Sequence, residues 1–263
     1  MITIVRHGDV TRLRLSSVGG VAAGYDVSAY VYRDVLIDSG FHRARADLVQ
    51  AIDRLDIQGA MITHWHEDHA GNAELLAARG VPLAMHPLTE STLREAPAIR
   101  LYRRVVWGKP PALVSRVAPF EHAALRFVPA PGHSPDHQVV WDAERATLFS
   151  GDLWLGVRAR VMHSSENPYG IVQSLRKIAA LEPQRMFDAH RGMVTEPGRA
   201  LRAKIDWLEE TMGRIEARVA EGWSDRAIRR EVLGGEERSA YVSLGEYARM
   251  NFVRAVRREK MRV

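Results

Sequence analysis

The sequence contains no cysteine. The absence of thiols excludes disulfide bonds and thiolate metal ligands, so imidazole and carboxylate groups are the only strong metal ligands that the chain offers. The opening residues, MITIVRHGDV, lack a charged start followed by an apolar run, and no later stretch approaches the roughly 20 apolar residues of a membrane span. We therefore expect a cytoplasmic protein that does not enter a membrane.

Lysine is scarce although the net charge is +5, because only four of the 37 basic residues are lysines. A positive charge invites a nucleic-acid interpretation, since neutralisation of phosphates by Lys and Arg dominates such binding. The arginines are spread along an alanine-rich chain, however, and their one local concentration, over 254–262, is typical of a solvated helix end. Nucleic acid is therefore the second choice of partner, after a small-molecule substrate.

The length of 263 residues fits one large domain, or one domain with a small appendage. With 46% apolar and 26% charged residues, the composition is that of an ordinary globular protein. After Thr195 an apolar residue recurs every three or four positions, which predicts a long helix with Thr195 as its N-cap. Ser224 and Ser243 are predicted to begin two further helices. We predict a catalytic domain over residues 1–197 and a helical appendage over 198–263.

The rest of the chain alternates strand and helix patterns. A hairpin is expected over 27–38, a helix over 48–55, a buried strand over 60–63, and a helix followed by a strand over 70–85. The second half is expected to contain strands at 125–128, 139–141, 147–149 and 185–188 and an amphipathic helix at 171–181. The order of strand, helix and strand implies a parallel pairing and therefore an α/β fold.

Histidine and aspartate residues gather directly after four of these strands. Within HWHEDH, an extended segment places His64 and His66 on one side, because side chains alternate faces, while Asp68 and His69 lie where the chain turns toward the next helix. Loops at strand ends are where an α/β scaffold brings distant residues together. The candidate metal ligands are His64, His66, Asp68, His69, His133, Asp152 and His190. Such a set is too large for one tetrahedral ion and suits two divalent ions, zinc first, with manganese or iron as alternatives.

These motifs match a known family, because HWHEDHAGN at 64–72 resembles the HxHxDH signature of the metallo-β-lactamase superfamily. The later motifs PGH, SGD and AH, which end at His133, Asp152 and His190, are similar to those of the family in order and position, and the resemblance covers roughly residues 1–195. It implies an α/β sandwich of two mixed β-sheets flanked by helices. It also implies the ligand roles: His64, His66 and His133 for one metal, Asp68, His69 and His190 for the other, and Asp152 as the bridge.

Departures from individual branches of the family narrow the function. Asp152 stands where β-lactamases with this ligand pattern have cysteine, which argues against antibiotic hydrolysis. His66 stands where flavodiiron oxygen reductases usually have glutamate, which argues against a redox role. In having an aspartate at position 152, the chain resembles glyoxalase II, the quorum-signal lactonases and the ribonuclease and phosphodiesterase branches. The segment RGMVT after His190 departs from the glyoxalase II pattern and argues against glutathione thioesters.

The hypothesis that follows is a dinuclear, metal-dependent hydrolase of an ester-like bond, thioester or lactone, in which a metal-bound hydroxide attacks the carbonyl. The resemblance implies a catalytic role for Asp68 as acceptor of the proton from the nucleophile. The alternatives are a phosphodiesterase or ribonuclease of the same fold, and a non-catalytic binding or signalling member. The sequence leaves open the substrate, the native metal and the oligomeric state.

Four further residues near the motifs are not predicted to bind metal. Asp38 resembles the family carboxylate that orients a ligand imidazole, although a turn-forming aspartate at a strand end explains it equally well. His86 and His137 are left out of the ligand set, because a structural or supporting role is the commoner one for a histidine in each of these places. His163 is also left out, because it lies in the loop between Asp152 and the next helix, which is expected to form a wall of the pocket.

Overall fold

The computed structural model describes residues 1–17, 26–96 and 98–261. Backbone contacts divide the chain into two compact units. The first, the sheet unit, comprises Met1–Pro129, Asp136–Asp152 and Arg185–Val194, and the second, the helical unit, comprises Ala130–Pro135, Leu153–Gln184 and Thr195–Val263. Neither unit is continuous in sequence, and the division into domains 1–197 and 198–263 stays a prediction.

The first sheet of the sheet unit has, within the described residues, six strands in the order β1-β2-β3-β4-β5-β6. They are β1 Ile2–His7, β2 Val10–Leu15, β3 Val27–Tyr32, β4 Val35–Ile37, β5 Gly59–Met61 and β6 Leu83–Ala84. Strands β1 to β4 pair antiparallel, whereas β4, β5 and β6 pair parallel. The predicted hairpin is β3 and β4. Its loop residues Arg33 and Asp34 both have positive φ, as in the two-residue turns that suit the twist of a hairpin.

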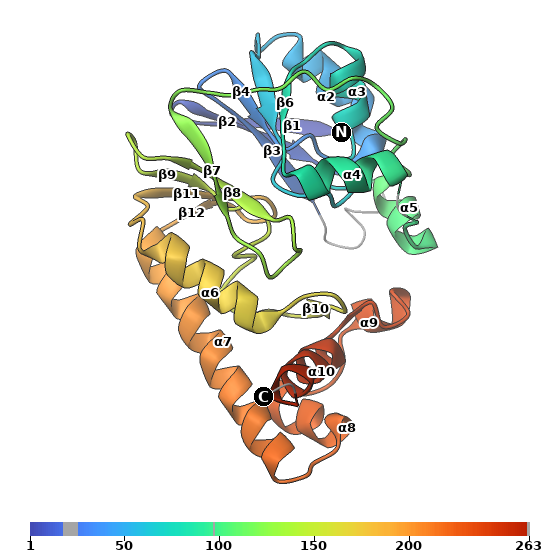
Figure 1. Ribbon diagram of the computed structural model, residues 1–263, viewed down its shortest axis with the longest axis vertical. Helices are drawn as coiled ribbons and strands as arrows, with labels where there is room; N and C mark the ends of the chain where they lie inside the picture. The colour runs from blue at the N-terminus through green and yellow to red at the C-terminus, as the bar shows by residue number, and fades with distance from the viewer. Residues whose placement is uncertain (18–25, 97, 262–263) are drawn as a thin grey trace. The chain divides into compact units, whose positions relative to one another are not determined.

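The second sheet has, in the part of the chain that the structure describes, five strands in the order β12-β11-β9-β8-β7. They are β7 Leu125–Pro129, β8 Gln138–Asp142, β9 Thr147–Phe149, β11 Arg185–Asp188 and β12 Gly192–Val194. Strands β9 and β11 pair parallel, and the other neighbours pair antiparallel. Figure 1 shows both sheets of the unit. The predicted α/β class with two mixed sheets and helices is confirmed.

Aromatic and aliphatic side chains fill the space between the two sheets. The ring of Tyr30 on β3 lies 5.4 Å from that of Phe149 on β9 and 5.5 Å from that of Phe187 on β11, measured between centroids. Met61 and Val140 belong to the same buried cluster. Full burial of such a side chain contributes about 1.5–3 kcal/mol, so this core fixes β5, β9 and β11, the strands that precede three of the ligand motifs.

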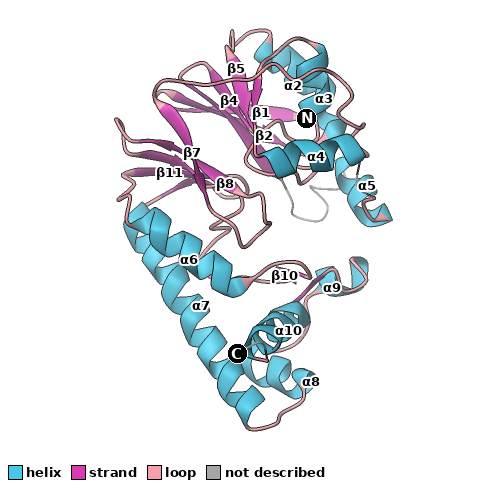
Figure 2. Ribbon diagram, in the orientation of Figure 1, coloured by secondary structure: helices cyan, strands magenta, loops and turns pink. Residues whose placement is uncertain are grey.

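Helices cover the other face of the first sheet. They are η1 His42–Ala44, α2 Arg45–Ile52, α3 Ala73–Ala78, α4 Pro87–Glu95 and α5 Leu101–Trp107, and Figure 2 draws α2 to α5 in cyan beside this sheet. Leu48 of α2, Leu76 of α3 and Trp107 of α5 share a buried cluster with Leu13 and Leu36 of the sheet. Along β3 and β4, alternate residues face either these helices or the second sheet.

Parallel pairing brings the ligand motifs to common sheet edges. Strands β4 and β5 are parallel, so the segments that begin with Asp38 and Ile62 leave the first sheet at the same edge. Strands β9 and β11 are parallel, so the segments that lead to Asp152 and His190 leave the second sheet together. The carboxyl ends of parallel strands are where α/β proteins bind ligands.

The helical unit contains α6 Pro168–Ala179, α7 Pro197–Ala220, α8 Asp225–Ile228, the π-helix η2 Arg229–Leu233, α9 Arg238–Val242 and α10 Arg249–Lys260. A short ladder joins β10 Met162–His163 to β13 Tyr247–Ala248. The helix expected at 171–181 and the long helix after Thr195 are confirmed as α6 and α7, and the hydroxyl of Ser224 caps α8. Among the described helices, none has the length and apolar character that a membrane crossing requires.

Two predicted helix starts are wrong. Glu196, in the left-handed conformation, occupies the N-cap position of α7 that was predicted for Thr195, and Pro197 is the first helical residue. Ser243 follows the end of α9 and does not begin a helix. Its hydroxyl accepts a hydrogen bond from the N–H of Tyr247 at 2.9 Å, and strand β13 separates this turn from α10. A serine can satisfy a backbone donor in a turn as well as at a helix start, so the local pattern could not distinguish the two.

Candidate metal centre

The ligand loop, residues 62–72, begins where β5 ends and leads into α3. Thr63 donates its backbone N–H to Asp38 Oδ1 at 2.8 Å and its hydroxyl to Asp38 Oδ2 at 3.0 Å. The same Oδ2 lies 2.8 Å from Nδ1 of His69, near the end of the loop. One buried carboxylate therefore holds both ends of the ligand loop. Both interpretations of Asp38 hold, because it orients an imidazole and also has the positive φ of a turn residue.

The first group of candidate ligands in the sheet unit consists of His64, His66 and Asp152. One ligand atom of each lies within 4.8 Å of the other two. The ring of His64 contacts two neighbours. Nδ1 of His64 lies 3.0 Å from the hydroxyl oxygen of Thr63, and Nε2 of His64 lies 3.0 Å from Nδ1 of His66. All three side chains are buried. Two imidazole nitrogens of the ligand loop and the carboxylate of Asp152, which follows β9, thus face one point that is shielded from bulk water.

The second group consists of Asp68, His69 and His190, whose ligand atoms also lie within 4.8 Å of one another. Asp68 Oδ2 lies 3.8 Å from Nε2 of His69 and 3.5 Å from Nε2 of His190. Asp152 Oδ1 lies 3.2 Å and 3.3 Å from the same two nitrogens. Asp152 therefore lies beside both groups.

Each imidazole of the second group is oriented through its Nδ1 atom. Nδ1 of His69 lies 2.8 Å from the carboxylate of Asp38, and Nδ1 of His190 lies 2.6 Å from the carbonyl oxygen of Asp26. A ring that donates from Nδ1 carries its lone pair on Nε2, which is the usual arrangement of a metal-binding histidine with a hydrogen-bonded partner. Both rings thus direct Nε2 toward Asp152.

The charges of the site shift pKa values in opposite directions. Burial lowers the pKa of His190, but Asp152 and Asp68 outweigh burial and raise this pKa to about 9. Burial likewise lowers the pKa of His69. The carboxylates of Asp152, Asp68 and Asp38 outweigh burial and raise this pKa well above its usual value. Conversely, burial raises the pKa of Asp152, but His69 and His190 hold it well below its usual range. The carboxylates of this cluster therefore attract positive charge, as protons or as metal.

The donor set fits a divalent metal ion. Nε2 of His69 is buried and, among the described residues, has no hydrogen-bond partner of acceptable geometry. Buried polar atoms normally have such a partner, and this nitrogen instead faces the carboxylates of Asp152 and Asp68 at 3.2 and 3.8 Å. Imidazole and carboxylate together are typical ligands of zinc and also suit manganese or iron.

The raised pKa of His190 predicts how pH affects the stability of the metal-free protein. Such a group stabilises the fold fully below its unfolded-state pKa, about 6.5, and loses this contribution as the pH rises through its folded-state value, about 9. We expect the melting temperature of chelator-treated protein to fall between these two pH values. The gain in melting temperature on adding zinc should increase over the same interval, because ligating imidazoles must be neutral. Differential scanning fluorimetry measures both quantities.

His190→Gln is the control for this pH dependence. The variant cannot take up the proton, so the melting temperature of its metal-free form should depend less on pH over the same interval. A melting temperature of metal-free wild-type protein that rises across the interval would contradict the prediction.

His133, the seventh predicted ligand, belongs to the helical unit. Its Nδ1 lies 2.7 Å from Glu166 Oε1, an arrangement that leaves Nε2 to act as a ligand atom. The loop before it is fixed to the start of α6, because Asn167 donates its backbone N–H to the carbonyl of Gly132 at 2.8 Å. Within the sheet unit the structure brings the other six predicted ligands together, and the participation of His133 stays a prediction.

The three histidines left out of the ligand set have other contacts. Nε2 of His137 accepts a hydrogen bond from the backbone N–H of Asp152 at 3.0 Å, so His137 holds the backbone of a candidate ligand. His86 is the N-cap of α4. His163 lies in the helical unit, 3.1 Å from Glu246. None of these contacts brings the three residues into the ligand groups described above.

Three supporting residues were not identified from the sequence. Glu67 is a buried member of the ligand loop, and its carboxylate accepts hydrogen bonds from Nε and Nη2 of Arg103 at 2.5 Å each. Oδ2 of Asp136 accepts hydrogen bonds from the N–H of Trp65 at 2.8 Å and from the hydroxyl of Thr89 at 2.7 Å, which ties the ligand loop to α4. Glu67 could have been recognised from the sequence, because it is a charged residue between two candidate ligands in a buried loop. Arg103 could not, because nothing distinguishes it from the many other arginines of the chain.

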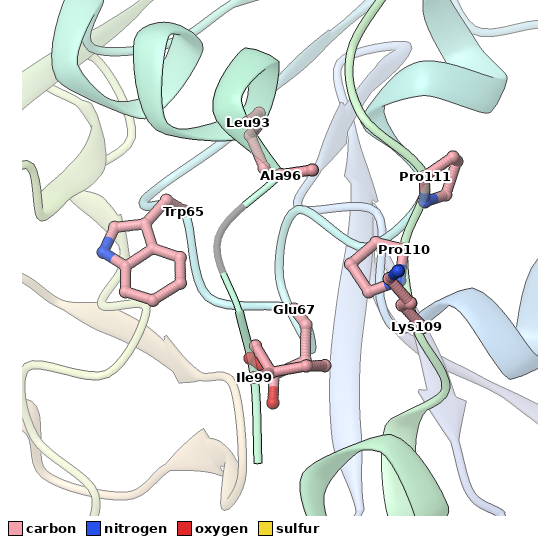
Figure 3. Close-up of a pocket in the computed structure, with 8 residues that line it drawn as sticks. All are labelled: Trp65, Glu67, Leu93, Ala96, Ile99, Lys109, Pro110 and Pro111. Atoms are coloured by element: carbon pink, nitrogen blue, oxygen red, sulfur yellow. The ribbon is translucent and has the colours of Figure 1, made fainter. Parts of the chain in front are cut away.

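A hollow borders the ligand loop. Figure 3 shows Trp65 on one side of it, Pro110 and Pro111 on the other and Glu67 between them. The full lining consists of Trp65, Glu67, Leu93, Ala96, Ile99, Lys109, Pro110 and Pro111. These residues are mostly apolar and include none of the candidate metal ligands, so the hollow is not the metal centre.

Comparisons with known proteins agree with the ligand motifs. A family model described as the metallo-beta-lactamase superfamily matches residues 23–190, the stretch that holds all seven candidate ligands. The chain is similar to a beta-lactamase-like protein 2 homolog from Drosophila melanogaster, with 29% identity over 171 residues, which are 63% of this chain and 57% of that protein. It is also similar to an atrochrysone carboxyl ACP thioesterase from Aspergillus fumigatus, with 31% identity over 176 residues, 65% of this chain and 51% of that protein. The chain thus spans about half the length of the curated relatives it matches.

Solved structures with the same architecture include a metallo-beta-lactamase family protein from Thermus thermophilus. The two structures align with a TM-score of 0.65 and 18% sequence identity. The alignment covers 97% of this chain and 93% of that one. The metallo-beta-lactamase FIM-1 from Pseudomonas aeruginosa, solved in a mono-zinc form, has a TM-score of 0.61 at 17% identity, covering 80% of this chain and 95% of that one. At these identities the likeness shows the fold alone.

Proposed function

Because the chain belongs to the metallo-β-lactamase superfamily, we propose that it is a metal-dependent hydrolase of an ester-like bond, with thioesters as the first substrate class and lactones as the second. The observation that carries the proposal is the position of Asp152 Oδ1, which lies beside both His69 and His190 while its carboxylate groups with His64 and His66. The name of the Aspergillus relative, an ACP thioesterase, supports a thioester held on a carrier.

We propose two divalent ions at this centre, zinc first, with manganese or iron as alternatives. The separation of the ligand atoms into two groups supports two ions, and the distances of 3.2 and 3.3 Å from Asp152 Oδ1 to the second group support a shared carboxylate. The proposed ligands are His64, His66 and His133 for one ion, Asp68, His69 and His190 for the other, and Asp152 for both.

When bound, a pair of divalent ions supplies a Lewis acid for the substrate carbonyl and a water that is activated near neutral pH. The residues of the chain supply orientation and proton transfer. Asp38 and the carbonyl of Asp26 hold the rings of His69 and His190. Asp68 Oδ2 faces the Nε2 atoms of both rings, and we propose that it accepts the proton of the attacking water. No serine or cysteine nucleophile is required.

A panel of three substrates tests the proposed function. Zinc-loaded protein is assayed on hexanoyl-N-acetylcysteamine, on an acylated homoserine lactone and on bis(p-nitrophenyl) phosphate. We expect the thioester to be turned over fastest, with activity lost on chelation and restored by zinc. His64→Ala protein, purified in parallel, controls for contaminating hydrolases.

The same panel separates the alternatives. Dominant turnover of the phosphodiester would place the chain with phosphodiesterases or ribonucleases and overturn the order proposed here. Stoichiometric metal without turnover of any of the three substrates would favour a non-catalytic binding or signalling member.

A further inference from the structure

Helix α5 has an outer face that combines apolar and positively charged side chains. Leu101, Arg104 and Val105 lie at helical positions that share one side. All three are exposed, Leu101 by 72% and Val105 by 55%. The opposite side of the helix carries Arg103 and Trp107, which are buried. The packing of α5 onto the sheet unit is therefore complete without the outer side chains, which are available to a partner.

Arg43 and Lys109 add positive charge at the C-terminal end of α5. Nη2 of Arg43 donates to the carbonyl oxygen of Arg104 at 3.4 Å, and the side chain of Arg43 lies against Gly108. Lys109 follows directly in the chain, and Arg43, Arg104 and Lys109 are all exposed. These three cations form no ion pair with any residue in the described ranges. The α5 face, defined as Arg43, Leu101, Arg104, Val105 and Lys109, therefore attracts negative charge.

Buried contacts connect α5 to the ligand loop. Arg103, on its inner side, pairs with Glu67 of the loop. The ring of Trp107 lies 4.9 Å from that of Phe41, and the carbonyl oxygen of Phe41 accepts a hydrogen bond from Nδ2 of Asn72, at the end of the loop, at 3.0 Å. A protein bound to the α5 face would therefore be held at a defined position relative to the candidate metal centre.

We infer that the α5 face docks an acidic, helical carrier protein that delivers an acyl thioester to the metal centre. The inference rests on the proposed thioesterase function and deepens it, because it names the partner that presents the substrate. A carrier helix with apolar and acidic side chains on one side complements Leu101 and Val105 together with the surrounding cations. A thioester at the end of a flexible prosthetic arm can enter the site while the carrier itself stays on α5.

Nucleic acid fits the α5 face less well than an acidic helix does. Proteins that bind single-stranded RNA combine cations with exposed aromatic rings on which the bases stack. The aromatic residues of α5 are the buried Trp107 and the half-buried Tyr102, and the centre of the face is aliphatic. An acidic amphipathic helix uses both the charges and the aliphatic pair.

Two substrates with the same thioester separate docking from chemistry. A hexanoyl group is presented on an acidic acyl carrier protein and, in parallel, on N-acetylcysteamine. Arg104→Glu reverses one charge of the α5 face, and Arg126→Glu, at an exposed position of β7 without an ion pair among the described residues, is the matched control. We expect Arg104→Glu to raise KM for the carrier-bound thioester about tenfold and to change kcat/KM for the small thioester by less than about twofold. Arg126→Glu should change neither value.

Direct binding of the holo carrier protein to zinc-loaded protein, measured by biolayer interferometry, makes the inference testable without turnover. Wild-type protein should bind it, with an affinity that falls as salt is added, and both Arg104→Glu and Leu101→Asp should weaken binding about tenfold or more. An equal affinity of wild type and Arg104→Glu, or no binding by wild type, overturns the inference.

The outcomes for docking and for chemistry are distinct. Hydrolysis of both thioesters with an unchanged KM in Arg104→Glu overturns the docking surface and leaves the proposed function standing. Failure of zinc-loaded wild type to hydrolyse the small thioester overturns the proposed function, and the binding measurement then still decides the docking surface. An RNA oligonucleotide that binds the α5 face, loses its affinity in Arg104→Glu and is not displaced by the carrier would assign the face to nucleic acid and overturn the inference.

Discussion

Asp152→Ala is expected to lower kcat/KM for the thioester by about 10³-fold or more and to reduce the metal content of the protein. The lost carboxylate lies 3.2 Å from Nε2 of His69 and 3.3 Å from Nε2 of His190. Its removal takes a donor from both ligand groups, and the several kcal/mol of transition-state stabilisation that metal ions provide correspond to about three orders of magnitude in rate. Steady-state kinetics and elemental analysis of the same preparation measure the two effects.

The matched control is Asp142→Asn, because Asp142 is a buried carboxylate of the sheet unit outside the metal centre. It accepts hydrogen bonds from the hydroxyl of Tyr32 at 2.7 Å and from Nε of Arg33 at 2.8 Å. This variant should lose stability but keep its metal content and its kcat. An Asp152→Ala protein with wild-type metal content and wild-type kcat/KM would show that Asp152 is not a ligand.

The ligand motifs could be predicted from the sequence because their information is local. His64, Asp152 and His190 each follow a short buried strand, and the spacing within HWHEDH fixes which side chains share a side. The first hairpin, β1 and β2, has no comparable signal. Ile2–His7 is an edge strand whose side chains are exposed or half-buried. Because neither of its faces is fully buried, its sequence does not need the strict alternation of apolar and polar residues that predicts a strand.

Contacts between distant residues could not be predicted in the same way. Arg103 is one of many arginines in the sequence, and only folding places it beside Glu67, 36 positions earlier. Likewise, the interpretation of Ser243 depends on the pairing of Tyr247 with β10, which no local pattern reveals. The candidate ligands and Asp38 were thus visible in the sequence, whereas Arg103 and Asp136, which also hold the ligand loop in place, were not.

The second large expected effect concerns the buried pair of Glu67 and Arg103. Arg103→Met is expected to lower the free energy of unfolding by about 3–5 kcal/mol, because it leaves the carboxylate of Glu67 buried without its counter-ion. Both side chains are almost fully buried, at 2% and 6% exposure, and two hydrogen bonds join them. Since Glu67 lies between two candidate ligands, weaker zinc binding should accompany the loss of stability. Urea unfolding, followed by tryptophan fluorescence, and zinc titration measure the two effects.

The loss of stability in Arg103→Met should grow with pH. Burial raises the pKa of Glu67 and Arg103 opposes this shift, so the pKa rises further when Arg103 is removed. A carboxyl group with a raised folded-state pKa favours the fold below its unfolded-state pKa, about 4.3, and this contribution disappears as the pH rises through the folded-state value. The variant should therefore be less destabilised near pH 5 than near pH 8.

Two further variants isolate the buried charge. Arg79→Met breaks an exposed pair with Asp53, whose side chains are 42% and 50% exposed, and should cost less than about 1 kcal/mol. The double variant Glu67→Leu/Arg103→Met should recover most of the lost stability, because it removes the uncompensated carboxylate together with its partner. An Arg103→Met protein that unfolds at the same urea concentration as Arg79→Met would contradict a stabilising role of the pair. A double variant no more stable than Arg103→Met would assign the loss to packing around α5, since the unpaired charge is absent from that protein.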